Sequence, residues 1–157
     1  YWVGRKYHHT MSSTLIYALR EALLMVEEEG LAARQLRHER NHLALVAGIE
    51  AMGLSLLPSE AESLWTLNAV KMPAGVDEAA VRRTMLTTYN IEVGAGLGPL
   101  AGKIWRVGLM GASSTPQTLL QFLAAFEGAL ATHGHRVPEG AGVAAASALL
   151  RSALLTA

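Results

Sequence analysis

Residues 94–109 have the sequence GAGLGPLAGKIWRVGL, a glycine-rich loop followed by an apolar segment whose only charge is Arg106. Alternation over residues 103–109 predicts a strand with Trp105 on one face and Arg106 on the other. An arginine beside a glycine loop is well shaped to bind a carboxylate through two parallel hydrogen bonds. The same spacing fits a solvent-facing arginine whose stem lies along apolar surface, so the pattern leaves both interpretations open.

The glycines of this loop do not match a phosphate-binding motif. Leu97 stands where a Walker motif needs its first glycine, and Ile104 stands where it needs Ser or Thr. Pro99 replaces the third glycine of the dinucleotide fingerprint. The glycines indicate a tight loop whose backbone approaches a ligand or another segment closely, and a plain connector between strands fits equally well.

The rest of the chain shows the periodicities of an α/β fold. Helical spacing of apolar residues predicts a first helix that begins after a cap at Ser12 or Ser13 and breaks at Gly30. The same spacing, with Asp77 and Pro116 as start signals, predicts further helices over residues 31–52, 78–89, 116–132 and 143–155. Besides 103–109, period-two or short apolar runs predict strands over 54–57, 66–72 and 91–93. This order indicates a small sandwich, with helices on one face of a mainly antiparallel sheet.

Composition excludes several classes of protein. The 157 residues include 13 basic and 13 acidic side chains and no cysteine, which argues against a nucleic-acid-binding surface and excludes disulfides or cysteine-ligated metals. The longest apolar run, 140–150, is too short to span a bilayer. A mean hydropathy of +0.26 and a start at Tyr1 indicate a piece of a longer protein, with one face made for the missing part.

Residues 38–42, HERNH, match the HExxH pattern of zinc peptidases. On a helix, His38 and His42 share a face and could bind zinc. Arg40 is charged where such helices pack in the core, no third histidine follows in residues 43–52, and the surrounding arginines would repel a dication. We therefore interpret this segment as a solvated, charged helix face, expect no metal site, and disfavour a metallopeptidase.

Two motifs together resemble one family. Residues 7–10, YHHT, precede residues 15–23, LIYALREAL, and the glycine loop continues into the strand through Gly111. In order and spacing, over about residues 1–133, the chain resembles the alanine–glyoxylate (serine–pyruvate, serine–glyoxylate) aminotransferases. These are class V enzymes of fold type I that use pyridoxal 5'-phosphate (PLP).

The resemblance implies a C-terminal fragment of such an enzyme. Residues 1–29 would end the large cofactor-binding domain, 30–135 would form the small α/β domain of the PLP-dependent transferase fold, and 136–157 would be a linker and a C-terminal helix. The resemblance implies that Tyr7 and Thr10 reach the partner subunit's cofactor phosphate in a homodimer. It also implies that Arg106 binds the substrate carboxylate.

The family's Schiff-base lysine, and the aspartate that pairs with the pyridine nitrogen, would lie upstream of this chain. The parent would move an amino group from alanine or serine to glyoxylate or pyruvate, whereas the fragment alone would be inactive and would not hold PLP. A cytoplasmic location is expected, because residues 154–157, LLTA, are not a peroxisomal address. The alternative is a non-catalytic α/β interaction module that docks through its final helix.

Overall fold

The computed structural model describes residues 3–4 and 9–154, with side chains up to residue 152. The chain divides into two compact units, Tyr1–Gln35 and Leu36–Ala157. Helix α2 (Leu31–Ala51) begins in the first unit and continues into the second. Within residues 3–4 and 9–154, none of the helices combines the length and the apolar composition of a membrane-spanning segment.

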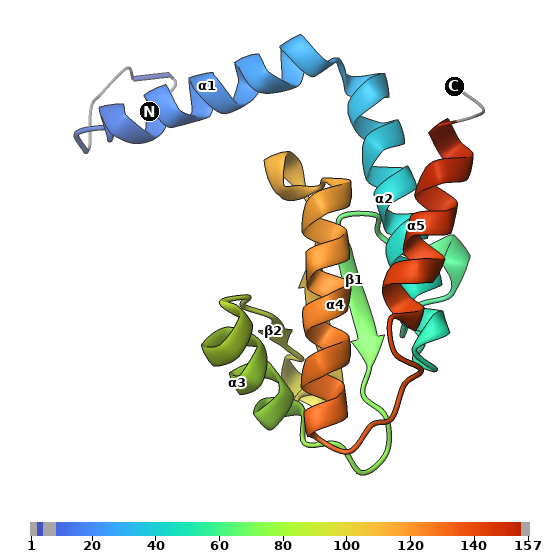
Figure 1. Ribbon diagram of the computed structural model, residues 1–157. Helices are drawn as coiled ribbons and strands as arrows, with labels where there is room; N and C mark the ends of the chain where they lie inside the picture. The colour runs from blue at the N-terminus through green and yellow to red at the C-terminus, as the bar shows by residue number, and fades with distance from the viewer. Residues whose placement is uncertain (1–2, 5–8, 155–157) are drawn as a thin grey trace. The chain divides into compact units, whose positions relative to one another are not determined.

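The first unit contains helix α1 (Ser13–Glu29), drawn in blue in Figure 1. The hydroxyl of Ser12 caps it by accepting a hydrogen bond from the backbone N–H of Leu15 at 3.4 Å. Gly30 ends it with φ +77°, a conformation that favours glycine, and donates its N–H to Val26 O at 2.9 Å. The predicted break at Gly30 is therefore confirmed.

The second unit is built on a three-stranded antiparallel sheet in the order β1-β3-β2. The strands are β1 (Leu67–Lys71), β2 (Gly94–Ala95) and β3 (Ile104–Gly108). In the central pairing Val70 lies opposite Trp105, and both side chains are fully buried. The mainly antiparallel sheet predicted from the sequence is confirmed.

Two predicted strands are wrong. Residues 54–57 make only an isolated bridge, Leu56 to Val70, because the chain leaves the sheet at Pro58, which has no N–H to donate. Residues 91–93 are not a strand, because the N–H of Ile91 bonds to Met85 O and closes the end of helix α3 (Glu78–Tyr89). The second partner of β3 is instead the start of the glycine loop, β2.

Helices α3, α4 (Pro116–Thr132) and α5 (Ala141–Leu154) confirm three predicted helices to within about two residues. Figure 1 shows α4 between α3 and α5, and both of these neighbours contact it. Helix α4 contributes Leu119, Leu123 and Phe126 to the core, where they meet the buried face of the sheet. Short 3₁₀ turns lie at Glu60–Glu62, Gly98–Leu100 and Gly111–Ser113.

Helix α5 is anchored by a carboxylate of α4. Glu127 accepts hydrogen bonds from the backbone N–H groups of Gly140 at 2.6 Å and Gly142 at 3.4 Å, at the start of α5. These N–H groups have no partner within the helix, and an anion is favoured at this end of the helix dipole. Ala146 and Leu150 then pack into the core.

We predict that Glu127→Ala lowers the free energy of unfolding by about 1–2 kcal/mol, because it leaves the first N–H groups of α5 without their acceptor. Urea unfolding of the chain measures the change. Glu139→Ala is the matched control, since that carboxylate is exposed and makes no hydrogen bond among the described residues. Equal stability of the two variants would show that Glu127 does not hold α5.

Candidate functional site

Arg106 lies in the middle of β3, on the face opposite Trp105. Trp105 is fully buried, packs edge-to-face on Phe126 with ring centroids 5.2 Å apart, and donates its indole N–H to Glu78 O at 3.2 Å. Successive side chains of a strand point to opposite faces, so burial of Trp105 directs Arg106 away from this part of the core. The side chain of Arg106 is half-buried.

The glycine loop positions the guanidinium group. Gly94 is the Cα partner of Arg106 in the sheet, and Ala95 O accepts a hydrogen bond from Nε of Arg106 at 2.6 Å. A Cβ on Gly94 would lie 3.3 Å from Cβ and 3.4 Å from Nη2 of Arg106. Because Gly94 has no side chain, the side chain of Arg106 has room to lie against β2 at this position.

Gly96 lies where the backbone of the glycine loop packs closely against Leu100 and Ile104. A Cβ at this position would lie 2.0 Å from Leu100 O and 2.9 Å from Cγ1 of Ile104, distances that no structure tolerates without rearrangement. The backbone N–H of Gly96 donates to Ile104 O at 3.2 Å, which continues the pairing with β3. The sequence left open whether the glycines allow a close approach or only connect strands. The structure shows a close approach of backbone to backbone.

The outer edge of the Arg106 guanidinium remains available. Its Nε is bound to Ala95 O, and within the described part of the chain no carboxylate lies within 4.0 Å of it. The two terminal nitrogens therefore present a planar pair of donors with no acidic partner. This arrangement is suited to a carboxylate that carries two oxygens in one plane.

Thr10, the second predicted contact to the cofactor, lies in the loop before α1 and is exposed. The first turn of α1 starts at Ser13, and the N-terminus of a helix favours an anion such as a phosphate. Tyr7 lies outside the described residues. Thr10 belongs to the unit Tyr1–Gln35 and Arg106 to the unit Leu36–Ala157.

The interpretation of residues 38–42 as a solvated face is wrong for the histidines. His38 and His42 are only 6% and 3% exposed. Nε2 of His38 accepts the backbone N–H of Gly111 at 3.0 Å, and Nδ1 of His42 bonds to Oδ1 of Asn68 at 2.7 Å. The match to HExxH thus comes from histidines that serve as internal hydrogen-bonding groups of the second unit.

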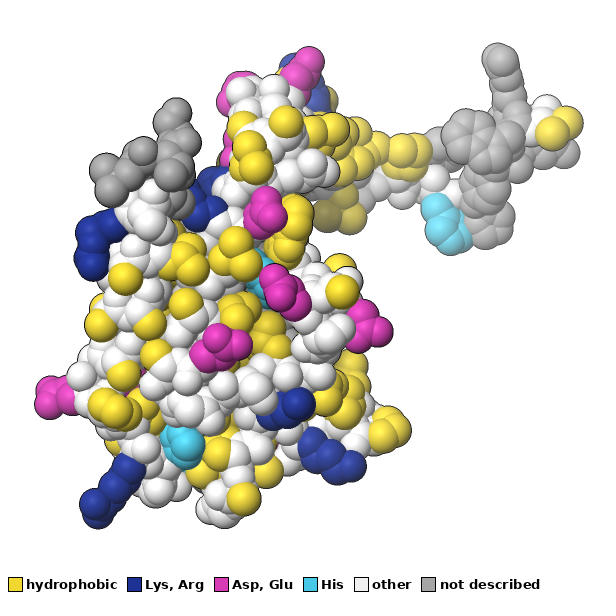
Figure 2. Space-filling view, turned by 90° about the vertical axis from the view of Figure 1, so that its right-hand side faces the viewer, with side chains coloured by type: hydrophobic (Ala, Val, Ile, Leu, Met, Phe, Trp, Pro, Cys, Tyr) yellow, Lys and Arg dark blue, Asp and Glu magenta, His cyan; other side chains and the backbone are white. Residues whose placement is uncertain are grey.

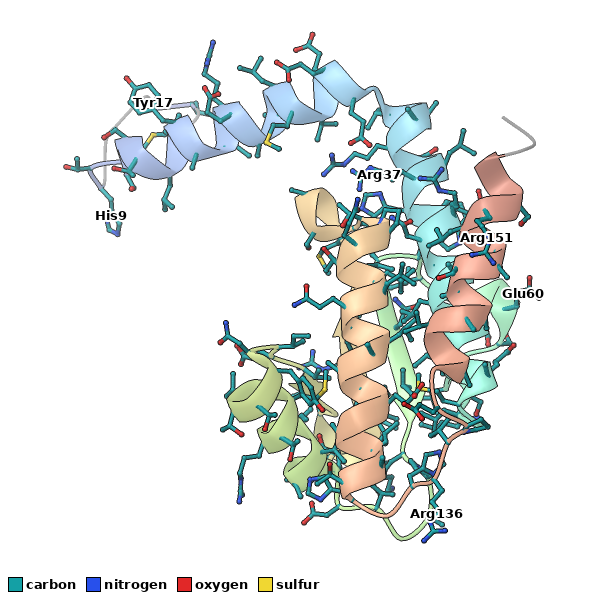
Figure 3. All side chains as sticks on the ribbon, in the orientation of Figure 1. His9, Tyr17, Arg37, Glu60, Arg136 and Arg151 are labelled. Atoms are coloured by element: carbon teal, nitrogen blue, oxygen red, sulfur yellow. The ribbon has the colours of Figure 1, made fainter. Side chains whose placement is uncertain are left out.

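Arg37 also differs from the predicted solvated surface. Its guanidinium points from α2 toward the start of α4 and donates to the carbonyl oxygens of Gly111 at 3.0 Å and Ser114 at 2.7 Å (Figure 3). Asn41 donates to the same carbonyl of Ser114 at 2.8 Å. The sequence predicts a solvated Arg37 beside His38 and gives no signal for Asn41, because the carbonyl groups that both residues bind are more than 70 residues away in the chain.

Comparison with known proteins shows the family to which the chain belongs. The chain is 42% identical over 147 residues to (S)-ureidoglycine–glyoxylate transaminase of Bacillus subtilis, covering 93% of this chain and 35% of that protein. It is 44% identical over 116 residues to alanine–glyoxylate aminotransferase of Drosophila melanogaster, covering 73% and 29% respectively. The chain is homologous to the C-terminal part of the alanine–glyoxylate aminotransferases.

Structural comparison agrees with this family. Pyridoxamine–pyruvate aminotransferase of Mesorhizobium loti superposes with a TM-score of 0.89 at 34% identity, over 97% of this chain and 39% of that one. The chain spans 28–38% of the length of the curated aminotransferases compared with it. No family model matches it. The expected fold, the small C-terminal domain of this transferase fold, is confirmed.

We predict that Gly96→Ala lowers the free energy of unfolding by about 3 kcal/mol, because its Cβ collides with the backbone of Leu100. Gly108→Ala on the neighbouring strand is the matched control, since the nearest atom to its Cβ is Cε of Met110 at 3.8 Å. Thermal or urea unfolding of both variants measures their free energies of unfolding. If both variants were equally stable, the close approach at Gly96 would not hold the loop.

Proposed function

We propose that this chain is the C-terminal part of a PLP-dependent aminotransferase that moves an amino group from alanine or serine to glyoxylate or pyruvate. The observation that carries the proposal is the Arg106 guanidinium, fixed by Ala95 O and otherwise without an acidic partner in the described residues. The homology to aminotransferases supports the reaction class, since the substrates of such enzymes are amino acids and oxo acids that carry a carboxylate.

The role of Arg106 follows from its geometry. Amino-group transfer requires the bond from the α-carbon to its hydrogen to be held in one orientation relative to the cofactor ring. A paired hydrogen bond from both terminal nitrogens to the α-carboxylate restricts rotation of the substrate, and Ala95 O restricts rotation of the arginine itself. Arg106 would therefore bind and orient the substrate.

The residues present fit part of a PLP site. Bound PLP would act as an electron sink for the substrate. The exposed hydroxyl of Thr10, at the N-terminal end of α1, suits a phosphate, and we propose that Thr10 and Tyr7 hold the phosphate of a partner subunit in a homodimer. The described lysines, Lys71 and Lys103, are exposed at the ends of β1 and β3, outside the motif that carries the cofactor lysine in this family. That lysine would come from a preceding segment.

The interaction module is not favoured. It would need the final helix as a free docking surface, but Ala146 and Leu150 of α5 are buried in the core. Glu127 also anchors the start of this helix.

We predict that Arg106→Ala in the enzyme that contains this chain raises KM for the amino acid on the order of 100-fold, because two charge-assisted hydrogen bonds are lost. Arg106→Lys should have a KM between those of the wild type and Arg106→Ala, since lysine keeps the positive charge but lacks the planar pair of donors. Cofactor affinity should stay unchanged. The exposed Arg83→Ala is the control. Near-normal kcat/KM in Arg106→Ala would contradict the assignment.

For the phosphate, we predict that Tyr7→Phe combined with Thr10→Val raises the Kd of PLP by about tenfold or more, because two donors to a charged group are removed. The matched control is Tyr17→Phe with Thr14→Val, the same chemical change on exposed positions of α1. Spectroscopic titration of the apoenzyme with PLP measures both, at protein concentrations above and below dimer dissociation. Unchanged affinity in the first variant would refute the cofactor contact.

A further inference from the structure

The second unit contains a cavity of about 350 Å³ that the proposed reaction does not use. It lies between α2 and the segment after it, and Arg106 does not line it. Its walls are apolar where Leu43 and Val46 of α2 face Leu56 and Pro58 of the following segment. Polar side chains also line the cavity, so it is suited to a ligand with an apolar middle and polar ends.

His42 supplies an acceptor from a buried position. The ring is 3% exposed and lines the cavity. The amide nitrogen of Asn68 donates to Val107 O at 3.5 Å, which leaves the amide oxygen to accept from Nδ1 of His42 at 2.7 Å. With Nδ1 as the donor of that bond, Nε2 is the ring nitrogen left to act as an acceptor, and no donor within the described residues bonds to it. Nε2 can therefore accept a hydrogen bond from a donor that enters the cavity.

Two carboxylates line the same cavity. Glu50 lies on α2 eight residues after His42, which corresponds to about 12 Å along the helix axis. Glu60 belongs to the 3₁₀ turn Glu60–Glu62 and projects outward from it (Figure 3). Neither carboxylate forms an ion pair with any described residue. Figure 2, which shows the right-hand side of Figure 1, has acidic side chains next to exposed hydrophobic side chains on this face.

We propose that this cavity binds a linear aliphatic diamine. One amino group donates to Nε2 of His42, the methylene chain lies against Leu43, Val46 and Leu56, and the other ammonium group pairs with Glu50. A five-carbon diamine with a hydrogen bond at each end spans roughly the 12 Å that separates the two α2 positions. Glu60 also lines the cavity and is exposed, so it adds a second negative charge to match the two ammonium groups of the diamine. The proposal is independent of the aminotransferase function.

The test is a titration of the chain with 1,5-diaminopentane, followed through the side-chain ¹⁵N resonances of His42. We expect a saturable shift of the Nε2 resonance, because that nitrogen accepts a new hydrogen bond. Glu50→Gln combined with Glu60→Gln should weaken binding about fivefold or more, since both positions are exposed and the fold does not depend on them. Glu27→Gln with Glu28→Gln on α1 is the control with the same change in net charge.

Three outcomes would overturn the proposal. The Nε2 resonance could stay unmoved while the diamine is added, or the cavity variant and the α1 control could bind the diamine equally well. The uncharged 1,5-pentanediol could also produce the same shift at the same concentrations, which would show that apolar contact alone fills the cavity. Backbone amide spectra of both variants check that each is folded.

Discussion

The burial of Trp105 is the constraint on which the candidate site depends. This side chain is enclosed on all sides, bonded through its indole N–H to Glu78 O, and packed edge-to-face on Phe126. Because the side chains of a strand alternate, fixing Trp105 in the core fixes Arg106 on the other face. A shift of β3 by one residue would bury the arginine charge and expose the indole, so the register of this strand is strongly determined.

The glycine loop converts that orientation into a defined position for the guanidinium. The loop forms the edge strand β2 next to β3, and a backbone carbonyl, that of Ala95, takes up the Nε donor of Arg106. A side chain at position 96 would collide with the backbone of Leu100, and one at position 94 would press against the side chain of Arg106. Holding the arginine in advance lowers the entropic cost of binding a carboxylate. The loop and the strand therefore act as one structural unit.

Helix α2 contributes a polar seam to the interior. His38, Asn41 and His42 are buried and bond to Gly111, Ser114 and Asn68 respectively, each more than 20 residues away in the chain. This seam ties α2 to β1 and to the turn before α4. It also explains why the HExxH pattern misleads: a helix that carries polar residues along one stripe is interpreted as solvated until the elements that cover it are known.

The sequence by itself determined the helices with clear end signals and the alternation of β3. Ser12, Gly30, Asp77 and Pro116 act through local backbone geometry and local hydrogen bonds, so their effect is visible without the fold. The resemblance to the aminotransferase family also came from local motifs, and the comparisons confirm it. Only the tertiary structure decided that β2 starts in the glycine loop, that Ala95 O binds Arg106, and that His38 and His42 are interior. These features depend on contacts between distant segments, in which a backbone carbonyl or a neighbouring element provides the partner and no residue type signals it in advance.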